Sequence, residues 1–163
     1  MFGRGLIVNA SPMIFLSRVD GLDWLTRLSR KRVQIPRAVV DELLHGSDGA
    51  AIMGKVNEKD RFTIVENTMP PALISAWDLG AGETQVLSRS LRQTDLRAVL
   101  DDWAARQCGL SLGLPVVGTL GIVLAAKRHG LVPLARPSIK RLLAEGLYLT
   151  PSLVQDALKT VDE

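Results

Sequence analysis

Cysteine, histidine and aromatic residues are scarce in this chain of 163 residues. Its single cysteine, Cys108, cannot form a disulfide within the chain, so we expect a reducing cytoplasm as the compartment. The chain has one cysteine and two histidines, so it contains no Cys/His ligand set for structural zinc. Aromatic residues make up 4%, so the composition indicates no platform on which the bases of a nucleic acid would stack.

Long apolar runs and glycine-rich phosphate loops are also missing. The longest apolar candidate, residues 118–126, is shorter than the roughly 18–20 residues of a membrane span. No small-residue cleavage site follows the brief apolar start, so we expect neither a signal peptide nor a membrane partner. Gly3 and Gly5 precede the first predicted strand instead of following it, which excludes the dinucleotide fingerprint and the NTPase phosphate loop.

The overall composition is that of a folded globular domain with a small positive charge. Apolar residues make up 47% and charged residues 23% of the chain. Lys and Arg number 20 against 17 Asp and Glu, which permits a nucleic-acid partner without implying one. Basic residues cluster at 27–32 and at 136–141. Taken singly, each cluster is explained by a helix face exposed to solvent.

Short β-branched runs alternate with helical patterns along the chain. The sequence predicts strands at 6–8, 33–35, 62–65, 98–100 and 115–117. It predicts helices that begin at Ser11 (as N-cap), break at Gly21 and resume, then helices near 36–45, 102–109, 119–129, 137–145 and 151–159. It also predicts a short helix after Pro71 and another, with Val86, Leu87 and Leu91, after residues 80–82. This alternation implies an α/β fold with a mostly parallel central sheet of about five strands flanked by helices. We expect residues 1–163 to form a single domain that includes the C-terminal helices at about 137–160, whose apolar face would pack on the core or, alternatively, form a dimer surface.

Acidic or amide residues follow several of these strands. Asn9 and Asp101-Asp102 come directly after two of them, and Glu42 and Glu83 lie in helices that follow strands. In open parallel sheets, ligands bind beyond the carboxyl ends of the strands. Oxygen ligands suit Mg²⁺ or Mn²⁺, and the matching reaction is metal-assisted phosphodiester hydrolysis.

Each of these residues also has a purely structural explanation. Glu83 would favour the helix dipole, and Asp101 or Asp102 would serve as an N-cap. Glu42 would be an ordinary surface residue, and Asn9 would form an Asx-turn. Only their joint placement at one predicted edge favours a shared site.

Five segments of the chain resemble, in order, the motifs of PIN-domain proteins, in particular an uncharacterised prokaryotic PIN-like subgroup. These segments are residues 7–14, 35–43, 79–84, 99–106 and 117–121. The resemblance runs from about residue 6 to residue 149. It implies a PIN fold, an acidic cleft that holds Mg²⁺ or Mn²⁺, and cleavage of single-stranded RNA. It also implies a role as the toxin of a toxin–antitoxin pair, a small antitoxin protein as partner, and a homodimer.

Carried over by position, the resemblance assigns the metal ligands to Glu42, Glu83 and Asp102, with Asp101 as neighbour or substitute. Asn9 stands where the family's first aspartate usually lies, so the cleft loses one negative charge. Ser11, Arg106 and Thr119 are candidates for contacting substrate or a charged group. For Arg106, one helical turn past Asp102, the alternatives are neutralising Asp102 and contacting a phosphate.

The leading hypothesis is therefore a metal-dependent endoribonuclease in which Asn9, Glu42, Glu83 and Asp102 carry the catalysis. The alternative, favoured by Asn9, is a PIN-like RNA- or protein-binding module with weakened catalysis. A nucleotide-binding α/β protein is the third hypothesis.

Overall fold

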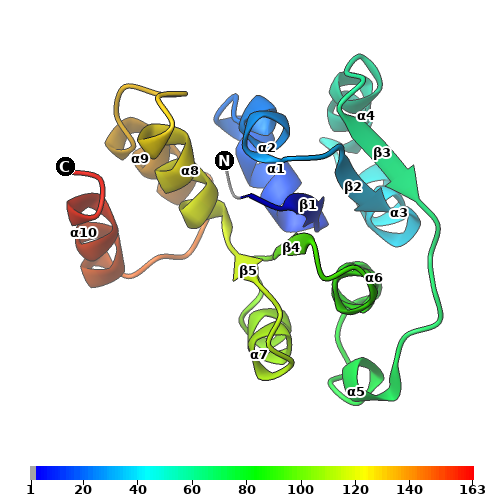
Figure 1. The fold of residues 1–163 in the computed structure, drawn as a ribbon. Coiled ribbons are helices and arrows are strands. Elements are labelled where there is room, and N and C mark those ends of the chain that lie inside the picture. Colours follow the sequence, from blue (N-terminus) through cyan, green and yellow to red (C-terminus); the bar gives the residue numbers. More distant parts are fainter. Residues whose placement is uncertain (1–2) are drawn as a thin grey trace.

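The computed structural model describes residues 3–163 and contains one sheet of five parallel strands in the order β3-β2-β1-β4-β5 (Figure 1). The predicted α/β fold with a central sheet of about five strands is confirmed, and here every strand pairing is parallel. The strands are β1 (Gly5–Val8), β2 (Val33–Pro36), β3 (Phe62–Val65), β4 (Leu96–Val99) and β5 (Val116–Val117).

Helices cover both faces of the sheet. On one face α1, α2 and α8 pack together, with α9 against α1 and α8; on the other, α6 lies against β1, β2 and β4 and is flanked by α5 and α7 (Figure 1). None of the helices in residues 3–163 has the length and apolar character needed to cross a membrane. The helices are α1 (Ala10–Arg18), α2 (Leu22–Leu28), α3 (Arg37–His45), α4 (Gly49–Asn57), α5 (Ala72–Ser75), α6 (Ala81–Arg92), α7 (Trp103–Ser111), α8 (Thr119–Arg128), α9 (Arg136–Ala144) and α10 (Pro151–Lys159).

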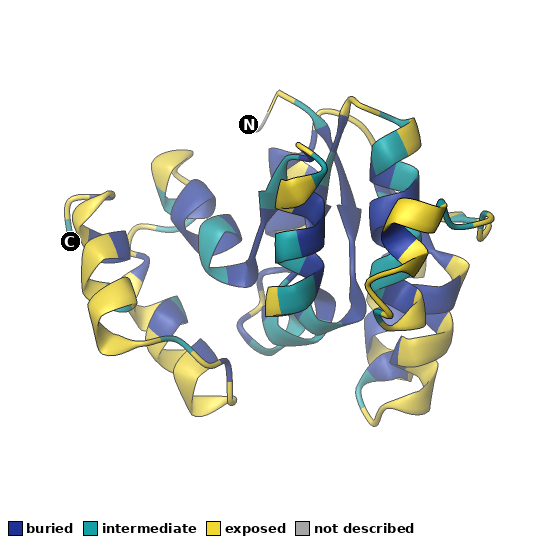
Figure 2. Ribbon diagram, turned by 90° about the horizontal axis from the view of Figure 1, so that it is seen from below, coloured by how far each residue is buried: buried dark blue, intermediate teal, exposed yellow. Residues whose placement is uncertain are grey.

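The central strands are buried on both faces, which explains why their sequences do not alternate between apolar and polar residues. Leu6, Ile7 and Val8 of β1 are fully buried, as are Ala98 and Val99 of β4. Figure 2 shows this burial in the strands and on the inner faces of the helices, whereas the outer faces of α9 and α10 are exposed.

The first helix begins two residues earlier than the sequence pattern predicts. Asn9, not Ser11, occupies the N-cap position of α1, because Asn9 continues the β1 ladder by donating its backbone N–H to Val99 O (3.1 Å) and the helix starts at Ala10. Pro12 is accommodated because backbone N–H groups in the first turn have no intrahelical acceptor. The predicted break at Gly21 is confirmed.

Helix α4 was not predicted. Its sequence contains Gly49 and Gly54, and glycine is a weak helix former, so packing against α3 and α1 supplies the stability that propensity does not. A Cβ on Gly49 would overlap Leu43 O, so the close approach of α4 to α3 requires glycine there. Strand β4 also begins two residues before the predicted 98–100, because Leu96 pairs with Gly5 of β1.

The C-terminal helices place part of their apolar face against the core. Leu142 and Leu158 are buried in the main apolar cluster, whereas Leu153 is 48% exposed. Glu163 joins the end of the chain to the start of α9, since its carboxylate accepts hydrogen bonds from the backbone N–H groups of Ala135 (2.6 Å) and Arg136 (3.1 Å). The extension of one domain over residues 1–163 stays a prediction.

Candidate active site

The strand order reverses between β1 and β4, which makes their carboxyl ends the topological switch point of the sheet. Asn9 follows β1, and Asp101 follows β4 after one residue. The ladder continues past the strands, because Leu100 donates its backbone N–H to Val117 O (2.9 Å). As a result, the residues after β1, β4 and β5 meet at one edge of the sheet.

Asn9 is buried at this edge and its side-chain oxygen is unpaired. The residue is 3% exposed, and Asn9 Oδ1 accepts no hydrogen bond. Although it holds the N-cap position, its side chain makes no capping hydrogen bond, so the Asx-turn explanation is wrong. A buried acceptor left unpaired costs about 1–3 kcal/mol, so Asn9 Oδ1 is a candidate ligand atom.

Glu42 and Asn9 converge on Gly82 in the first turn of α6. Glu42 Oε1 accepts a hydrogen bond from the Gly82 backbone N–H (2.8 Å). A Cβ placed on Gly82 would lie 2.7 Å from Asn9 Oδ1 and 2.9 Å from each carboxylate oxygen of Glu42. The absent side chain therefore lets an amide oxygen and a carboxylate approach the same point of the backbone.

Glu83 shares the electrostatic environment of these residues. Its Oε2 accepts the Gly80 backbone N–H (3.0 Å), which fixes the side chain at the start of α6. Burial raises the pKa of Glu83 above its ordinary value of 4.5, and the negative charges of Asp102 and Glu42 raise it further. The Gly80 N–H and a hydrogen bond from Asn9 oppose this shift. Asn9, Glu42 and Glu83 thus lie around the start of α6, and Asp102 is near enough for its charge to act on Glu83.

The raised pKa of Glu83 predicts a pH-dependent effect on stability. The native state binds the Glu83 proton more tightly than the unfolded chain, so this stabilisation is complete below pH 4.5 and is lost as pH rises through the native pKa. Glu83→Gln is therefore expected to raise Tm at pH 8 by about 2 °C and to have little effect at pH 4. The measurement is thermal unfolding of both proteins in EDTA across this range, with Glu58→Gln, a change at an exposed residue, as the control. A Glu83→Gln effect that does not grow with pH would contradict this assignment.

The two adjacent aspartates have different roles. Asp102 is the N-cap of α7, and its Oδ1 accepts the Ala105 N–H (2.8 Å), so its other oxygen is left for a ligand. Asp101 accepts the Thr119 N–H (2.7 Å) and hydroxyl (2.6 Å), and the Ser11 hydroxyl lies 3.4 Å from it. Asp101 therefore joins β4 to the start of α8.

Arg106 does not neutralise Asp102. Among the described residues it forms no ion pair, and its Nη1 donates only to Leu100 O (3.4 Å). A Cβ on Gly118 would collide with the Arg106 guanidinium, so glycine at that position makes room for the cation. Its charge is available to a ligand.

Oxygen atoms suitable for a hard cation are present, although a complete carboxylate cluster is not. In residues 3–163, no group of three or more Asp, Glu, His or Cys side chains is arranged to hold a metal ion. The set at this edge is mixed, because Asn9 contributes an amide oxygen beside the carboxylates. The unpaired Asn9 Oδ1 and the free oxygens of Glu42 and Asp102 have the chemistry that Mg²⁺ or Mn²⁺ requires.

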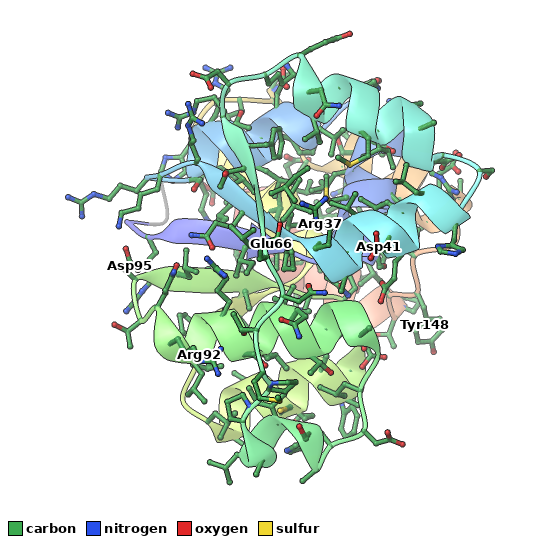
Figure 3. All side chains as sticks on the ribbon, turned by 90° about the vertical axis from the view of Figure 1, so that its right-hand side faces the viewer. Arg37, Asp41, Glu66, Arg92, Asp95 and Tyr148 are labelled. Carbon is green, nitrogen blue, oxygen red and sulfur yellow. The ribbon has the colours of Figure 1, made fainter. Side chains whose placement is uncertain are left out.

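The basic cluster at 27–32 lies away from this site. Lys31 and Arg32 immediately precede β2, at the amino end of the sheet, and form ion pairs with Asp95 and Asp60. Figure 3 shows Asp95 at one end of the sheet and Asp41, the neighbour of Glu42, at the other. This cluster is therefore not part of the candidate site.

Comparisons with known proteins agree with this architecture. The family profile DUF3368, described as a PIN domain, matches residues 5–163. The solved structure of the PIN domain endonuclease Utp24 superimposes with a TM-score of 0.53 at 14% sequence identity, over 70% of this chain and 84% of that one. At this identity the likeness concerns the fold alone. A search of curated proteins finds no match.

Proposed function

Because this chain belongs to the PIN-domain family DUF3368 and has the fold of a PIN endonuclease, we propose that it is a divalent-metal-dependent endoribonuclease acting on single-stranded RNA. The observation that carries the proposal is the buried, unpaired Asn9 Oδ1 beside the carboxylates of Glu42 and Glu83. A buried oxygen acceptor next to two acids is costly without a cation. A nucleic-acid substrate fits the small positive net charge of +3.

Backbone N–H groups at the starts of two helices hold the acids in place. Gly82 and Gly80 of the α6 start fix Glu42 and Glu83, and Ala105 in the first turn of α7 fixes Asp102. Because each carboxylate uses one oxygen for its helix, it is oriented before any ligand binds. This is the preorganisation that an active site requires.

Mg²⁺ or Mn²⁺, when bound, would acidify a water molecule and neutralise charge on the phosphate. Glu42 and Asp102 would hold the ion, and Asn9 Oδ1 would complete the set from the buried side. Glu83, whose pKa is raised, is suited to hold a proton taken from water during hydrolysis. Asp101 and Thr119 would keep the start of α8 in position beside the site.

Replacing Asn9 by Asp tests this assignment through metal binding. Asn9→Asp restores a negative charge beside Glu42 and Glu83, so the protein is expected to bind Mn²⁺ about tenfold more tightly, which is 1.4 kcal/mol. The variant should also be less stable without metal, because it adds a like charge next to Glu83. Thermal unfolding in EDTA and in rising Mn²⁺ measures both effects. An equal Mn²⁺ response in wild type, Asn9→Asp and Asn9→Ala would contradict a role for this position.

A PIN-like RNA- or protein-binding module with weakened catalysis is the second candidate. It is favoured by Asn9 and by the absence of a three-carboxylate cluster within residues 3–163. If wild type responds weakly to Mn²⁺ and only Asn9→Asp gains cleavage, this second function holds.

The resemblance adds narrower proposals about the biological setting. These are a toxin role, a small antitoxin protein as partner, a homodimer, and a cytoplasmic location. Each stays a prediction. The exposed leucines of α9 and α10, Leu143 and Leu153, provide apolar surface for a second chain.

A further inference from the structure

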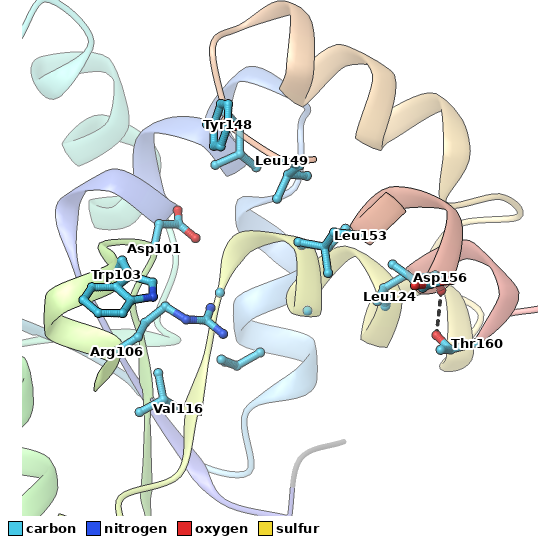
Figure 4. Close-up of a pocket in the computed structure, with 16 residues that line it drawn as sticks. Asp101, Trp103, Arg106, Val116, Leu124, Tyr148, Leu149, Leu153, Asp156 and Thr160 are labelled. Carbon is cyan, nitrogen blue, oxygen red and sulfur yellow. Dashed lines mark hydrogen bonds between the residues drawn. The ribbon is translucent and has the colours of Figure 1, made fainter. Parts of the chain in front are cut away.

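A groove adjoins the candidate active site on the side of β5. It has a volume of 810 Å³ and runs between the starts of α7 and α8 and the C-terminal segment around α10. Figure 4 shows Asp101, Trp103 and Arg106 along one wall and Tyr148, Leu149 and Leu153 along the other. Asp101 belongs to both the groove and the candidate site, so the two are continuous.

Two aromatic side chains at this groove are unusually exposed. Trp103 is 74% exposed and Tyr148, the only tyrosine of the chain, is 87% exposed. Tyr148 projects from the same end of the molecule as Asp41 in Figure 3. Large aromatic residues are buried on average, so two exposed rings at one groove indicate a ligand surface.

The composition gave no sign of this surface, because stacking depends on placement and not on the number of aromatic residues. Trp103 directly follows Asp102, the acid that caps α7, so the first turn of α7 places it next to the candidate site. Arg106, one turn later on the same helix, lines the same groove. Its guanidinium has no ion-pair partner among the described residues.

We propose that this groove binds a nucleobase of the RNA strand, next to the phosphate held at the acidic site. The proposal rests on the proposed nuclease function and names the part of the substrate that this second site takes. Base and phosphate of one nucleotide are joined through its sugar, so a phosphate at Asp102 brings a neighbouring base to Trp103. Leucine side chains line the rest of the groove around the base.

The two aromatic side chains and Arg106 then have different tasks. Trp103 and Tyr148 stack on the base, and stacking is indifferent to sequence because every base has an aromatic face. The planar Arg106 guanidinium contacts the adjoining phosphate. These residues bind substrate and take no part in the proton transfer.

Abasic substitution of the RNA tests the groove directly. Binding of a labelled single-stranded oligonucleotide is measured by anisotropy in Ca²⁺, so the readout does not require turnover. Trp103→Ala is expected to weaken binding about tenfold, and Trp103→Phe to restore most of it. Trp77→Ala, which removes an exposed tryptophan (39%) that does not line the groove, is the matched control and should leave binding unchanged.

Removing bases from the RNA tests whether the aromatic side chains of the groove contact a base. In wild type, replacing every base of the oligonucleotide by an abasic position should weaken binding at least as much as Trp103→Ala, and the same RNA should bind the double variant Trp103→Ala/Tyr148→Ala with no additional loss. Losses that add up would overturn the proposal, as would unchanged RNA binding by Trp103→Ala or no RNA binding by wild type. So would a change of oligomeric state in Trp103→Ala without an effect on RNA, since that would assign the groove to a second copy of the chain.

Failure of this inference can be distinguished from failure of the proposed function. RNA binding that depends on Trp103 without any cleavage keeps the groove and rejects the nuclease. Cleavage that is insensitive to Trp103 and to abasic positions keeps the nuclease and rejects the groove.

Discussion

Gly82→Ala is expected to reduce cleavage of single-stranded RNA by about 100-fold while the protein stays folded. The added Cβ would lie 2.7 Å from Asn9 Oδ1 and 2.9 Å from both Glu42 oxygens, so these two side chains must move apart. Misplacement of catalytic groups by about 1 Å costs an enzyme this much activity. The measurements are kcat with Mn²⁺ and far-UV circular dichroism of the same preparation.

Gly54→Ala is the matched control for this substitution. Gly54 lies inside α4, and a Cβ there would meet nothing within 4 Å. Alanine is the better helix former by about 1 kcal/mol, so this variant should be at least as stable as wild type and fully active. Equal activity of Gly82→Ala and Gly54→Ala would contradict the placement of the site at the start of α6.

Glu42→Gln is expected to lower cleavage by about 100-fold or more and to weaken Mn²⁺ binding. Glutamine keeps the shape of the side chain and can still accept the Gly82 N–H, so the change removes the charge and little else. Since Glu42 also raises the pKa of Glu83, the variant should lower the pH at which Glu83 titrates.

Asp41→Asn provides the comparison for Glu42→Gln on the same helix. Asp41 is exposed, carries the same charge and directly precedes Glu42, but it has no hydrogen bond to the start of α6 among the described residues. Its replacement should change activity less than about twofold, as is usual for surface substitutions. If both variants lose activity equally, a general loss of negative charge would explain the result and Glu42 would not be a specific ligand.

Much of the fold follows from local sequence signals. Continuous apolar runs such as Leu6-Ile7-Val8 predict strands buried on both faces, and their alternation with helices predicts the parallel sheet. Helix α4 escaped prediction because its stability comes from packing against α3, which no local pattern reveals. The first helix start was misplaced because a strand hydrogen bond of Asn9 outweighed the Ser-Pro capping signal.

The strand ends and the PIN resemblance predict acids at one edge of the sheet, whereas they do not predict the hydrogen-bond partners of each acid. The sequence left Asp101 and Asp102 equivalent, and only their partners separate them: Thr119 for one and Ala105 for the other. Arg106 was expected beside Asp102 from helical spacing, but room at Gly118 sends it towards the groove. The contacts of Asp101 with Thr119 and of Arg106 with Gly118 join residues distant in sequence, so local patterns do not reveal them.

Cleavage of single-stranded RNA by purified wild-type protein in Mn²⁺ tests the central claim most directly. The proposed site predicts cleavage that requires Mn²⁺, stops in EDTA and is lost in Asp102→Asn. Absence of cleavage by wild type, together with cleavage by Asn9→Asp under the same conditions, would contradict it. That outcome would identify the natural chain as a PIN-like binding module whose catalysis was lost at Asn9.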